Sequence, residues 1–186
     1  MLPHTITLET KRLLLKELTP EVYDYIFANW DDNAIITYLG YATQQDYELE
    51  QEKYRKGLTS YFLSFKNFLM VEKATGIIIG RIGYHTWKAV HNRAEIGYGL
   101  YREEHKRLGY MTEAMLPVLK YGFEHMDLNR VEAFASPLNV PSIKLIESHG
   151  FTKEGLLRQH YGRNGIMEDS AVYGLLKPEF EALNMG

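Results

Sequence analysis

The chain has 186 residues and no cysteine, and its 21 lysines and arginines face 24 aspartates and glutamates, for a net charge of −3. At the usual ~150 residues per domain, we expect a single domain over residues 1–186. Without cysteine there is no disulfide framework, no thiolate metal site and no cysteine nucleophile. The near balance of charge argues against direct nucleic-acid binding, which depends on clustered cations.

The sequence also bears on compartment and oligomeric state. The first residues have neither the basic start nor the apolar run of a signal peptide. The longest apolar stretch, 61–71, is interrupted by Lys66 and Asn67 and is far shorter than the roughly 20 residues that span a bilayer. We therefore expect a cytoplasmic protein without a membrane partner. A homo-oligomer remains open.

The first half of the chain predicts strands and helices in alternating blocks. Pro20 marks the start of one helix, and the turn at 73–76 joins two strand-like runs into a hairpin. The expected elements are a strand at 5–18, helices at 20–30 and about 44–56, and strands at 60–72, 76–87 and 93–101. The last three strands form an antiparallel meander.

The second half predicts a different pattern. Between Gly109 and Phe123, apolar residues recur at the spacing of one helical face. After this helix we expect a strand at 130–135, a helix at 142–148 and strands at 151–157 and 165–176. This order predicts an α/β (α+β) fold with a mixed sheet and helices on both faces. A ligand then belongs where strands diverge, between the strand ending at Leu100 and the strand 130–135.

The turn at 105–107 is a candidate anion-binding site. A strand leads into His105-Lys106-Arg107, and a helix begins near Gly109. Free backbone N–H groups and the positive end of the helix dipole favour a diphosphate there. The alternative is that Lys106 and Arg107 are solvated loop charges. Neither the Walker nor the Rossmann glycine pattern is present.

A second set of residues surrounds the helix at 142–148. Asn139 stands at its N-cap position, Pro141 and Ser142 follow in the first turn, and Gly150 marks its end before Phe151. Each of these residues is also explained as a cap, a turn or a core contact.

Together these segments resemble the GNAT superfamily of acyl-coenzyme-A-dependent N-acetyltransferases, and more narrowly its ribosomal-protein (RimJ/RimL-like) branch. The motifs that carry the resemblance are Thr10-Lys11-Arg12-Leu13, Ala94-Glu95-Ile96-Gly97-Tyr98, Gly109-Tyr110-Met111-Thr112-Glu113-Ala114, Leu128-Asn129-Arg130-Val131-Glu132-Ala133, Asn139-x-x-Ser142-x-x-Leu145-x-Glu147-x-x-Gly150-Phe151 and Asp169-x-x-x-Tyr173-x-Leu175-Leu176. The resemblance implies a GNAT-like, mostly antiparallel central sheet. The phosphate loop departs from the family pattern, because Gly109 is the only usual glycine kept and Met111 occupies a small-residue position.

The resemblance implies acetyl-CoA as cofactor and an amine acceptor as partner. The residues it assigns to the cofactor are Tyr98, Gly99, Leu100, Lys106, Arg107, Leu108, Gly109, Tyr110, Met111, Thr112, Asn139 and Ser142. Aromatic residues in segments that line the family's acceptor groove are Trp30, Tyr38, Tyr61 and Tyr84. Core packing is the alternative for each of these four. The histidines lack metal-ligand spacing, so no metal is expected.

Three residues are candidates for the chemistry. Glu95 is the candidate general base, although an outward-facing strand carboxylate would look the same. Ser142 matches the position that protonates the departing thiolate in the ribosomal-protein branch, or it serves the helix cap. Asp169 is an alternative base or amine anchor. Because there is no cysteine, we expect direct attack in a ternary complex.

The acceptor stays open at this stage. The leading hypothesis is a protein N-terminal α-amine. A small amine such as an aminoglycoside or polyamine is the second hypothesis, for which an acidic groove is needed. Candidate acids for that groove are Asp31, Asp32, Glu48, Glu50 and Glu52. A non-catalytic acyl-CoA-binding module is the third hypothesis.

Overall fold

The computed structural model describes residues 2–57, 64–163 and 165–184. Its strands are β1 (Thr7–Glu9), β2 (Leu13–Leu18), β3 (Ser64–Glu72), β4 (Ile78–Lys88), β5 (Arg93–Leu100), β6 (Arg130–Ala135), β7 (Thr152–Arg163) and β8 (Ile166–Leu176). Its helices are α1 (Pro20–Asn29), α2 (Asp32–Leu39), α3 (Gln44–Arg55), α4 (Tyr110–His125), α5 (Val140–Ser148) and α6 (Lys177–Asn184).

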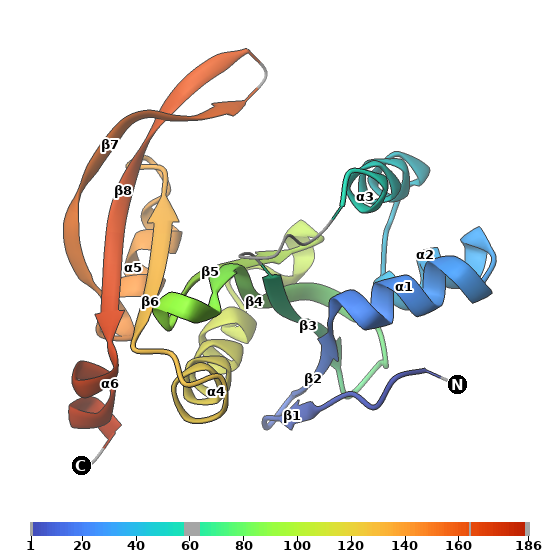
Figure 1. The fold of residues 1–186 in the computed structure, drawn as a ribbon, viewed down its shortest axis with the longest axis horizontal. Coiled ribbons are helices and arrows are strands. Elements are labelled where there is room, and N and C mark those ends of the chain that lie inside the picture. The colour runs from blue at the N-terminus through green and yellow to red at the C-terminus, as the bar shows by residue number, and fades with distance from the viewer. Residues whose placement is uncertain (1, 58–63, 164, 185–186) are drawn as a thin grey trace.

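The strands form one sheet in the order β1-β2-β3-β4-β5-β6-β8-β7. Neighbouring strands are antiparallel except β5 and β6, which are parallel. A mixed, mostly antiparallel sheet is therefore confirmed. The β7–β8 hairpin extends well beyond the rest of the sheet (Figure 1).

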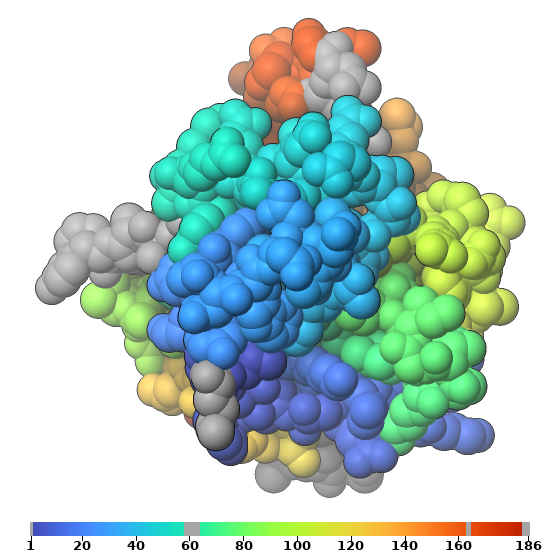
Figure 2. All heavy atoms as spheres, turned by 90° about the vertical axis from the view of Figure 1, so that its right-hand side faces the viewer, coloured from blue at the N-terminus to red at the C-terminus, as the bar shows by residue number. Residues whose placement is uncertain are grey.

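Helices cover both faces of the sheet. On one face, α4 buries Ala114, Val118 and Leu119 in the same apolar cluster as Ile82 and Ile96 of the strands. On the other face, α1, α2 and α3 form a second cluster with inward residues of β3. These three helices make one continuous surface below the hairpin tip (Figure 2). Every helix in the described ranges is too short or too polar to cross a bilayer.

The N-terminal region differs from the prediction of one long strand. A turn at Thr10–Arg12 divides it into β1 and β2, and Glu113 of α4 holds this turn. The Thr10 hydroxyl and the Arg12 backbone N–H both donate to Glu113 Oε1 at 2.6 Å. The Arg12 guanidinium adds an ion pair at 2.6 Å. The break therefore depends on a residue a hundred positions away, which strand propensity does not indicate.

Two helices were not expected as separate elements. In α2, the Asp31 side chain accepts a hydrogen bond from Ala34 N at 2.9 Å, and Gly40 ends the helix with φ of 75°. At the C-terminal end, α6 rests on the core through Phe180, whose ring stacks on Phe123 with centroids 4.8 Å apart. Both are short, so tertiary contacts and caps outweigh their weak periodicity.

Candidate active site

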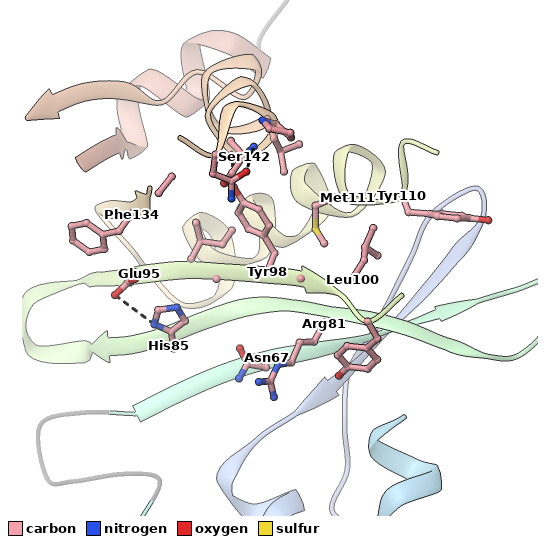
Figure 3. Close-up of a pocket in the computed structure, with 18 of the residues that line it drawn as sticks. Asn67, Arg81, His85, Glu95, Tyr98, Leu100, Tyr110, Met111, Phe134 and Ser142 are labelled. Carbon is pink, nitrogen blue, oxygen red and sulfur yellow. Dashed lines mark hydrogen bonds and ion pairs between the residues drawn. The ribbon is translucent and has the colours of Figure 1, made fainter. Parts of the chain in front are cut away.

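A deep cleft lies where β5 and β6 separate. The two strands pair only over Arg93–Glu95 and Arg130–Glu132. Beyond this pairing they diverge and leave a cleft of about 1310 Å³ (Figure 3). The second half of β5, the loop before α4 and the start of α5 line it. This is the position that the strand order predicted for a ligand.

Strand alternation divides the cleft into two sides. Ala94 and Ile96 of β5 are buried in the cluster that contains α4. Because successive side chains point to opposite faces, Tyr98 shares that side and Glu95 faces the other, as Figure 3 shows. We call the two groups of lining residues the α5 side (Tyr98, Leu100 and Ser142) and the α3 side (Glu50, Asn67, Arg81, His85 and Glu95).

Glu95 is a buried carboxyl group on the α3 side, with 9% of its surface exposed. Burial raises the pKa of Glu95 to about 7, and the Glu132 carboxylate acts in the same direction. The Thr86 hydroxyl, 3.4 Å from Glu95 Oε2, and the Tyr161 hydroxyl of β7 oppose the shift by hydrogen bonding. A carboxyl group with this pKa exchanges its proton readily near neutral pH, as a general base must.

His85 packs beside this carboxyl group. Its Nδ1 lies 3.5 Å from Glu95 Oε2. Burial lowers the pKa of His85, and the nearby Arg81 lowers it further, so the ring is neutral at pH 7. The contact is therefore polar and not an ion pair. The ring also lies over Gly97, where a Cβ atom would collide with it.

Thr86 carries backbone strain next to these two residues. It has φ of 55°, in the left-handed region that β-branched residues rarely adopt. The β4–β5 register shifts between His85 and Lys88, which places Thr86 within a bulge. Its hydroxyl lies 3.2 Å from His85 Nδ1 and within reach of Glu95. The bulge thus turns one hydroxyl toward both groups.

Two hydroxyl groups meet on the α5 side. Tyr98 Oη and Ser142 Oγ lie 2.8 Å apart. Burial raises the pKa of Tyr98, so its hydroxyl keeps its proton at neutral pH. The Asn139 side chain accepts a hydrogen bond from Ser142 N at 3.3 Å, which confirms the predicted cap and fixes Ser142 in the first turn of α5. The hydroxyl pair can therefore donate a proton into the cleft.

The N-terminus of α4 opens onto the same cleft. Gly109 stands at the cap with φ of 78°, and no side chain caps the helix. Residues 109–112 line the cleft, so the free N–H groups and positive dipole end face it. Arg107 and Lys106 also line this end, where Lys106 forms an ion pair with Glu103. Leu108 differs, since its side chain is half-exposed outside the lining.

The predicted aromatic acceptor contacts have other places in the fold. Tyr84 is 0% exposed and donates to the Val118 carbonyl at 2.9 Å, so the prediction that it contacts a substrate is wrong. Trp30 and Tyr38 contact each other edge to face at 5.1 Å, outside the cleft lining. Tyr61 lies outside the described residues. Packing into the core and the α1–α2 layer explains the first three.

Asp169 is not beside Glu95 in the cleft lining. Its Oδ1 accepts a hydrogen bond from Gln159 N at 2.8 Å, and it lines a smaller hollow of about 310 Å³. Gln159 has φ of 50° within the register shift between Leu157 and Tyr161. Asp169 therefore holds the bulge that brings Tyr161 toward Glu95.

Several lining residues were missed by the sequence analysis. They are Asn67, Arg81, His85 and Thr86, all on β3 or β4. A signal was available, because Arg81 and His85 lie an even number of positions apart in one strand and so share a face. Their closeness to Glu95 depends on the β4–β5 register, which pairs His85 with Glu95.

Comparison with known proteins identifies the family. A family model described as Acetyltransferase (GNAT) domain matches residues 12–152. This chain belongs to the GNAT acetyltransferase family. A relative described as uncharacterized N-acetyltransferase p20, from Bacillus licheniformis, is 34% identical over 94% of this chain and 98% of its own length. The putative ribosomal N-acetyltransferase YdaF of Bacillus subtilis is 37% identical over 57% of each chain.

A solved structure shows the same fold. The spermidine N-acetyltransferase from Vibrio cholerae, in complex with CoA and spermine, has a TM-score of 0.66 at 20% identity, covering 91% of this chain and 98% of that one. Members of the GNAT family bind acetyl-CoA, so acetyl-CoA is the cofactor of this N-acetyltransferase. The uncapped N-terminus of α4 and the hydroxyl pair above β5 fit such a molecule, because they offer donors for phosphates and a proton for a thiolate.

Proposed function

We propose that this N-acetyltransferase acetylates the α-amine of a protein N-terminus, as in the ribosomal-protein (RimJ/RimL-like) branch. The partial likeness to the putative ribosomal N-acetyltransferase YdaF supports this acceptor. The observation that carries it is the charge on the α3 side of the cleft, described next.

A polyamine acceptor needs carboxylates that are free to bind its cations. Glu50 is the one of the five helical acids that lines the cleft, within the part of the chain that is described. Its Oε1 accepts a 2.6 Å hydrogen bond from Tyr23, and its oxygens lie 3.3 Å from Lys53 Nζ and 3.6 Å from an Arg81 nitrogen. Although burial opposes it, Arg81 and Tyr23 keep the pKa of Glu50 below its ordinary value. This carboxylate is therefore already neutralised.

The other four acids are engaged or exposed away from the cleft lining. Asp31 caps α2, Asp32 accepts a hydrogen bond from Tyr47 at 2.6 Å, Glu52 pairs with Lys56 at 2.7 Å, and Glu48 is exposed. The acidic groove that the small-amine hypothesis requires is thus not formed by these residues. A protein N-terminus, which brings a single cation, fits better.

Acetyl-CoA supplies an activated thioester to this reaction. Glu95 removes the proton from the acceptor ammonium, directly or through water, and the amine nitrogen then attacks the acyl carbon. The carbonyl oxygen is stabilised by a backbone N–H in the 98–100 segment of β5. As the N–C bond forms and the C–S bond breaks, the Ser142–Tyr98 pair would donate a proton to the sulfur, and the second proton released by the acylated nitrogen would return that pair to its neutral form through water. The first turn of α4 holds the pyrophosphate.

The residues available favour direct transfer. The chain has no cysteine that could form an acyl-thioester. Incubation with acetyl-CoA alone should therefore release no stoichiometric burst of thiol and leave the protein mass unchanged. A mass increase of one acetyl group on a cleft residue would contradict direct transfer.

The acceptor is tested by thiol release from acetyl-CoA with a panel of amines. The panel contains peptides that begin with serine or alanine, the same peptides with a blocked N-terminus, spermidine and an aminoglycoside. We expect turnover of the free peptides and none of the blocked ones. Preferential turnover of spermidine would overturn the proposed acceptor, and acetyl-CoA binding without any turnover would indicate the wrong substrate panel or a lost activity.

A further inference from the structure

The α3 side of the cleft carries more positive than negative charge beside Glu50. Arg81 and Lys53 share this single carboxylate, at 3.6 and 3.3 Å, and all three residues line the cleft. Among these three residues, about one unit of positive charge is uncompensated; the other carboxyl group of the α3 side, Glu95, lies beside His85. Arg81 also has five N–H donors, and the long contact to Glu50 occupies one nitrogen. Its guanidinium is therefore able to receive another anion.

Free space lies directly across from Arg81. In the β4–β5 register Arg81 pairs with Gly99, and a Cβ atom added at Gly99 would meet nothing within 4 Å. At Gly97, by contrast, the corresponding space is filled by the ring of His85. On the α3 side, the space next to Gly99 is therefore empty and the space next to Gly97 is occupied. A ligand group that enters from the α3 side has room next to Arg81.

A second polar side chain faces this space. Asn67 of β3 pairs with Gly83, two residues from Arg81 on the neighbouring strand. Such diagonal neighbours lie about 7–8 Å apart, so their side chains can contact one small group. Figure 3 shows both side chains below β5, on the side of His85 and Glu95. An amide and a guanidinium together suit a carboxylate, since both offer N–H donors.

We propose that the acceptor carries a carboxylate close to its reactive amine, and that Arg81 and Asn67 bind this carboxylate next to Gly99, on the α3 side of the cleft. This inference rests on the proposed function and narrows its substrate class to acidic α-amine acceptors. The carboxylate has two chemical sources. It is either the side chain of an acidic residue that follows the acetylated residue or the terminal carboxylate of a very short acceptor.

The test measures kcat/KM for matched acceptor pairs that differ only in a carboxylate. One pair is Ser-Asp and Ser-Asn at the start of an amidated peptide, and the other is the Ser-Gly dipeptide with a free or an amidated C-terminus. We expect at least about a tenfold preference for the carboxylate in one pair, the effect of one charge-assisted hydrogen bond. The pair that shows the preference identifies the source.

Two substitutions of the same ion pair should change this preference in opposite directions. Arg81→Gln removes the anion-binding charge. The kcat/KM of the carboxylate acceptor, divided by that of its neutral partner, should therefore fall close to one. Glu50→Gln keeps an acceptor for Tyr23 but frees Arg81 and Lys53, so the ratio should rise severalfold. Both kcat/KM values in a ratio are measured on the same variant, so a lower fraction of folded enzyme changes both equally and does not alter the ratio. Lys88→Gln is the control, a cation removed from the same strand outside the cleft lining.

The outcomes separate the two proposals. The carboxylate assignment is overturned if the kcat/KM ratio of the matched acceptors is near one in the unchanged enzyme. It is also overturned if Arg81→Gln and Glu50→Gln shift this ratio in the same direction. In both cases, turnover of the peptides still supports the proposed function. Acetylation of spermidine but of no peptide overturns both. If Arg81→Gln is too unstable to assay, Arg81→Lys replaces it. The assignment is then overturned if both Arg81→Lys and Asn67→Ala leave the kcat/KM ratio of the matched acceptors unchanged.

Discussion

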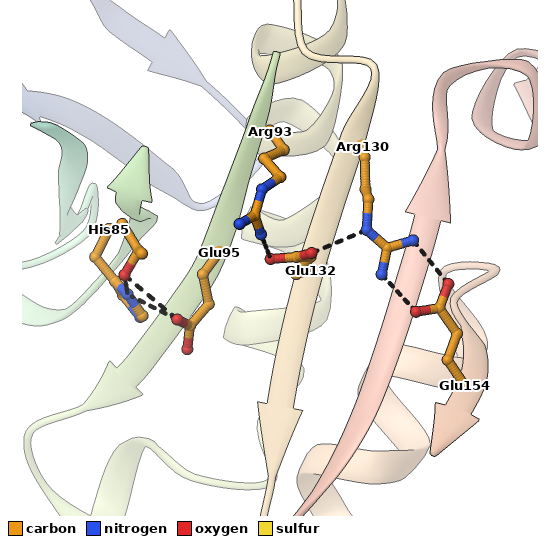
Figure 4. A network of polar contacts seen from close by, with 7 residues as sticks. His85, Arg93, Glu95, Arg130, Glu132 and Glu154 are labelled. Carbon is orange, nitrogen blue, oxygen red and sulfur yellow. Dashed lines mark hydrogen bonds and ion pairs between the residues drawn. The ribbon is translucent and has the colours of Figure 1, made fainter. Parts of the chain in front are cut away.

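Glu95 and Glu132 are neighbours in register on the parallel strands β5 and β6, yet their surroundings differ completely. Figure 4 shows Glu132 between two arginines, with Arg93 at 2.6 Å and Arg130 at 3.0 Å. Arg130 continues the network to Glu154 of β7. Glu95 stands at the point where the strands separate, and its polar neighbours in the described structure besides Glu132 are His85, Thr86 and Tyr161.

The comparison shows how one strand pair provides both structure and chemistry. On the β6 side of this register pair, Glu132 and its arginines neutralise one another and hold β5, β6 and β7 together across β8. On the β5 side, burial without a cation leaves Glu95 with a raised pKa. Two carboxylates whose environments differ in this way are suited to different roles. Glu132 is structural, and Glu95 is our candidate base.

The largest expected effect comes from replacing the Glu95 carboxylate. Glu95→Gln should lower kcat/KM by about 10²–10⁴-fold, the usual contribution of general base catalysis. Glu132→Gln, the same change one strand away, should retain activity near neutral pH and lower the free energy of unfolding by about 1 kcal/mol. Steady-state kinetics of both variants measure the change in kcat/KM, and denaturant titration measures the change in the free energy of unfolding. A Glu95→Gln enzyme within twofold of the original rate would remove Glu95 from the mechanism.

The pH dependence should follow the same carboxyl group. The base must be ionised, so kcat/KM should rise with pH through about 7, the pKa to which burial raises Glu95. Because Glu132 contributes to that raised pKa, Glu132→Gln should move the midpoint to lower pH. A midpoint that is identical in both enzymes would show that another group is titrating.

Ionisation of Glu95 should affect stability in the opposite direction to activity: activity rises with pH, whereas the contribution of Glu95 to stability falls. A carboxyl group with a raised pKa in the folded state stabilises the fold fully below its unfolded pKa, and this contribution is lost as pH rises toward the folded value of about 7. Glu95→Gln should therefore raise Tm more at pH 8 than at pH 4. Thermal melts at the two pH values check this difference.

The hydroxyl pair on the α5 side should have an intermediate effect. Ser142→Ala and Tyr98→Phe each leave one hydroxyl in place, so each should lower kcat by about tenfold, less than the roughly 10²–10⁴-fold expected when an acid catalyst is lost entirely. The double variant should lose more than either single one. If Ser142→Ala stays within twofold at saturating acetyl-CoA, the Ser142 hydroxyl is not the proton donor and Tyr98 is the remaining donor to test.

In the ion-pair network around Glu132, Gly174 of β8 permits Arg130 and Glu154 to meet. A Cβ atom there would lie 2.5 Å from Glu154 Oε1 and 2.7 Å from an Arg130 nitrogen. Gly174→Ala should therefore displace this ion pair and lower the free energy of unfolding by about 1 kcal/mol, with kcat unchanged. Gly155→Ala on β7, where a Cβ would meet nothing within 4 Å, is the matched control.

The smallest effect is expected at the phosphate end. Lys106 is half-exposed and already paired with Glu103. Lys106→Ala should raise the KM for acetyl-CoA by no more than about fivefold, the value of an exposed charge interaction. In our proposal the backbone donors of α4 carry most of the binding, so a loss of more than about a hundredfold would show that Lys106 contacts the phosphates directly.

Local signals in the sequence determined several features. The helical spacing after Gly109, the Asn139 cap and the strand at 130–135 depend on neighbours in the chain, and each has its expected place. The order of strands and helices also indicated where β5 and β6 separate. These features were predictable because periodicity, caps and turns are short-range properties.

Tertiary structure alone decided which groups meet in the cleft. Tyr84 is buried because its face of β4 packs on α4, and Asp169 is turned toward the Gln159 bulge. Arg81 faces Gly99, and His85 faces Glu95, through a register between strands that no single segment specifies. The pKa of Glu95 likewise depends on burial by distant elements. The sequence by itself therefore determined the elements and the candidate base, whereas strand register and burial determined its partners and its chemistry.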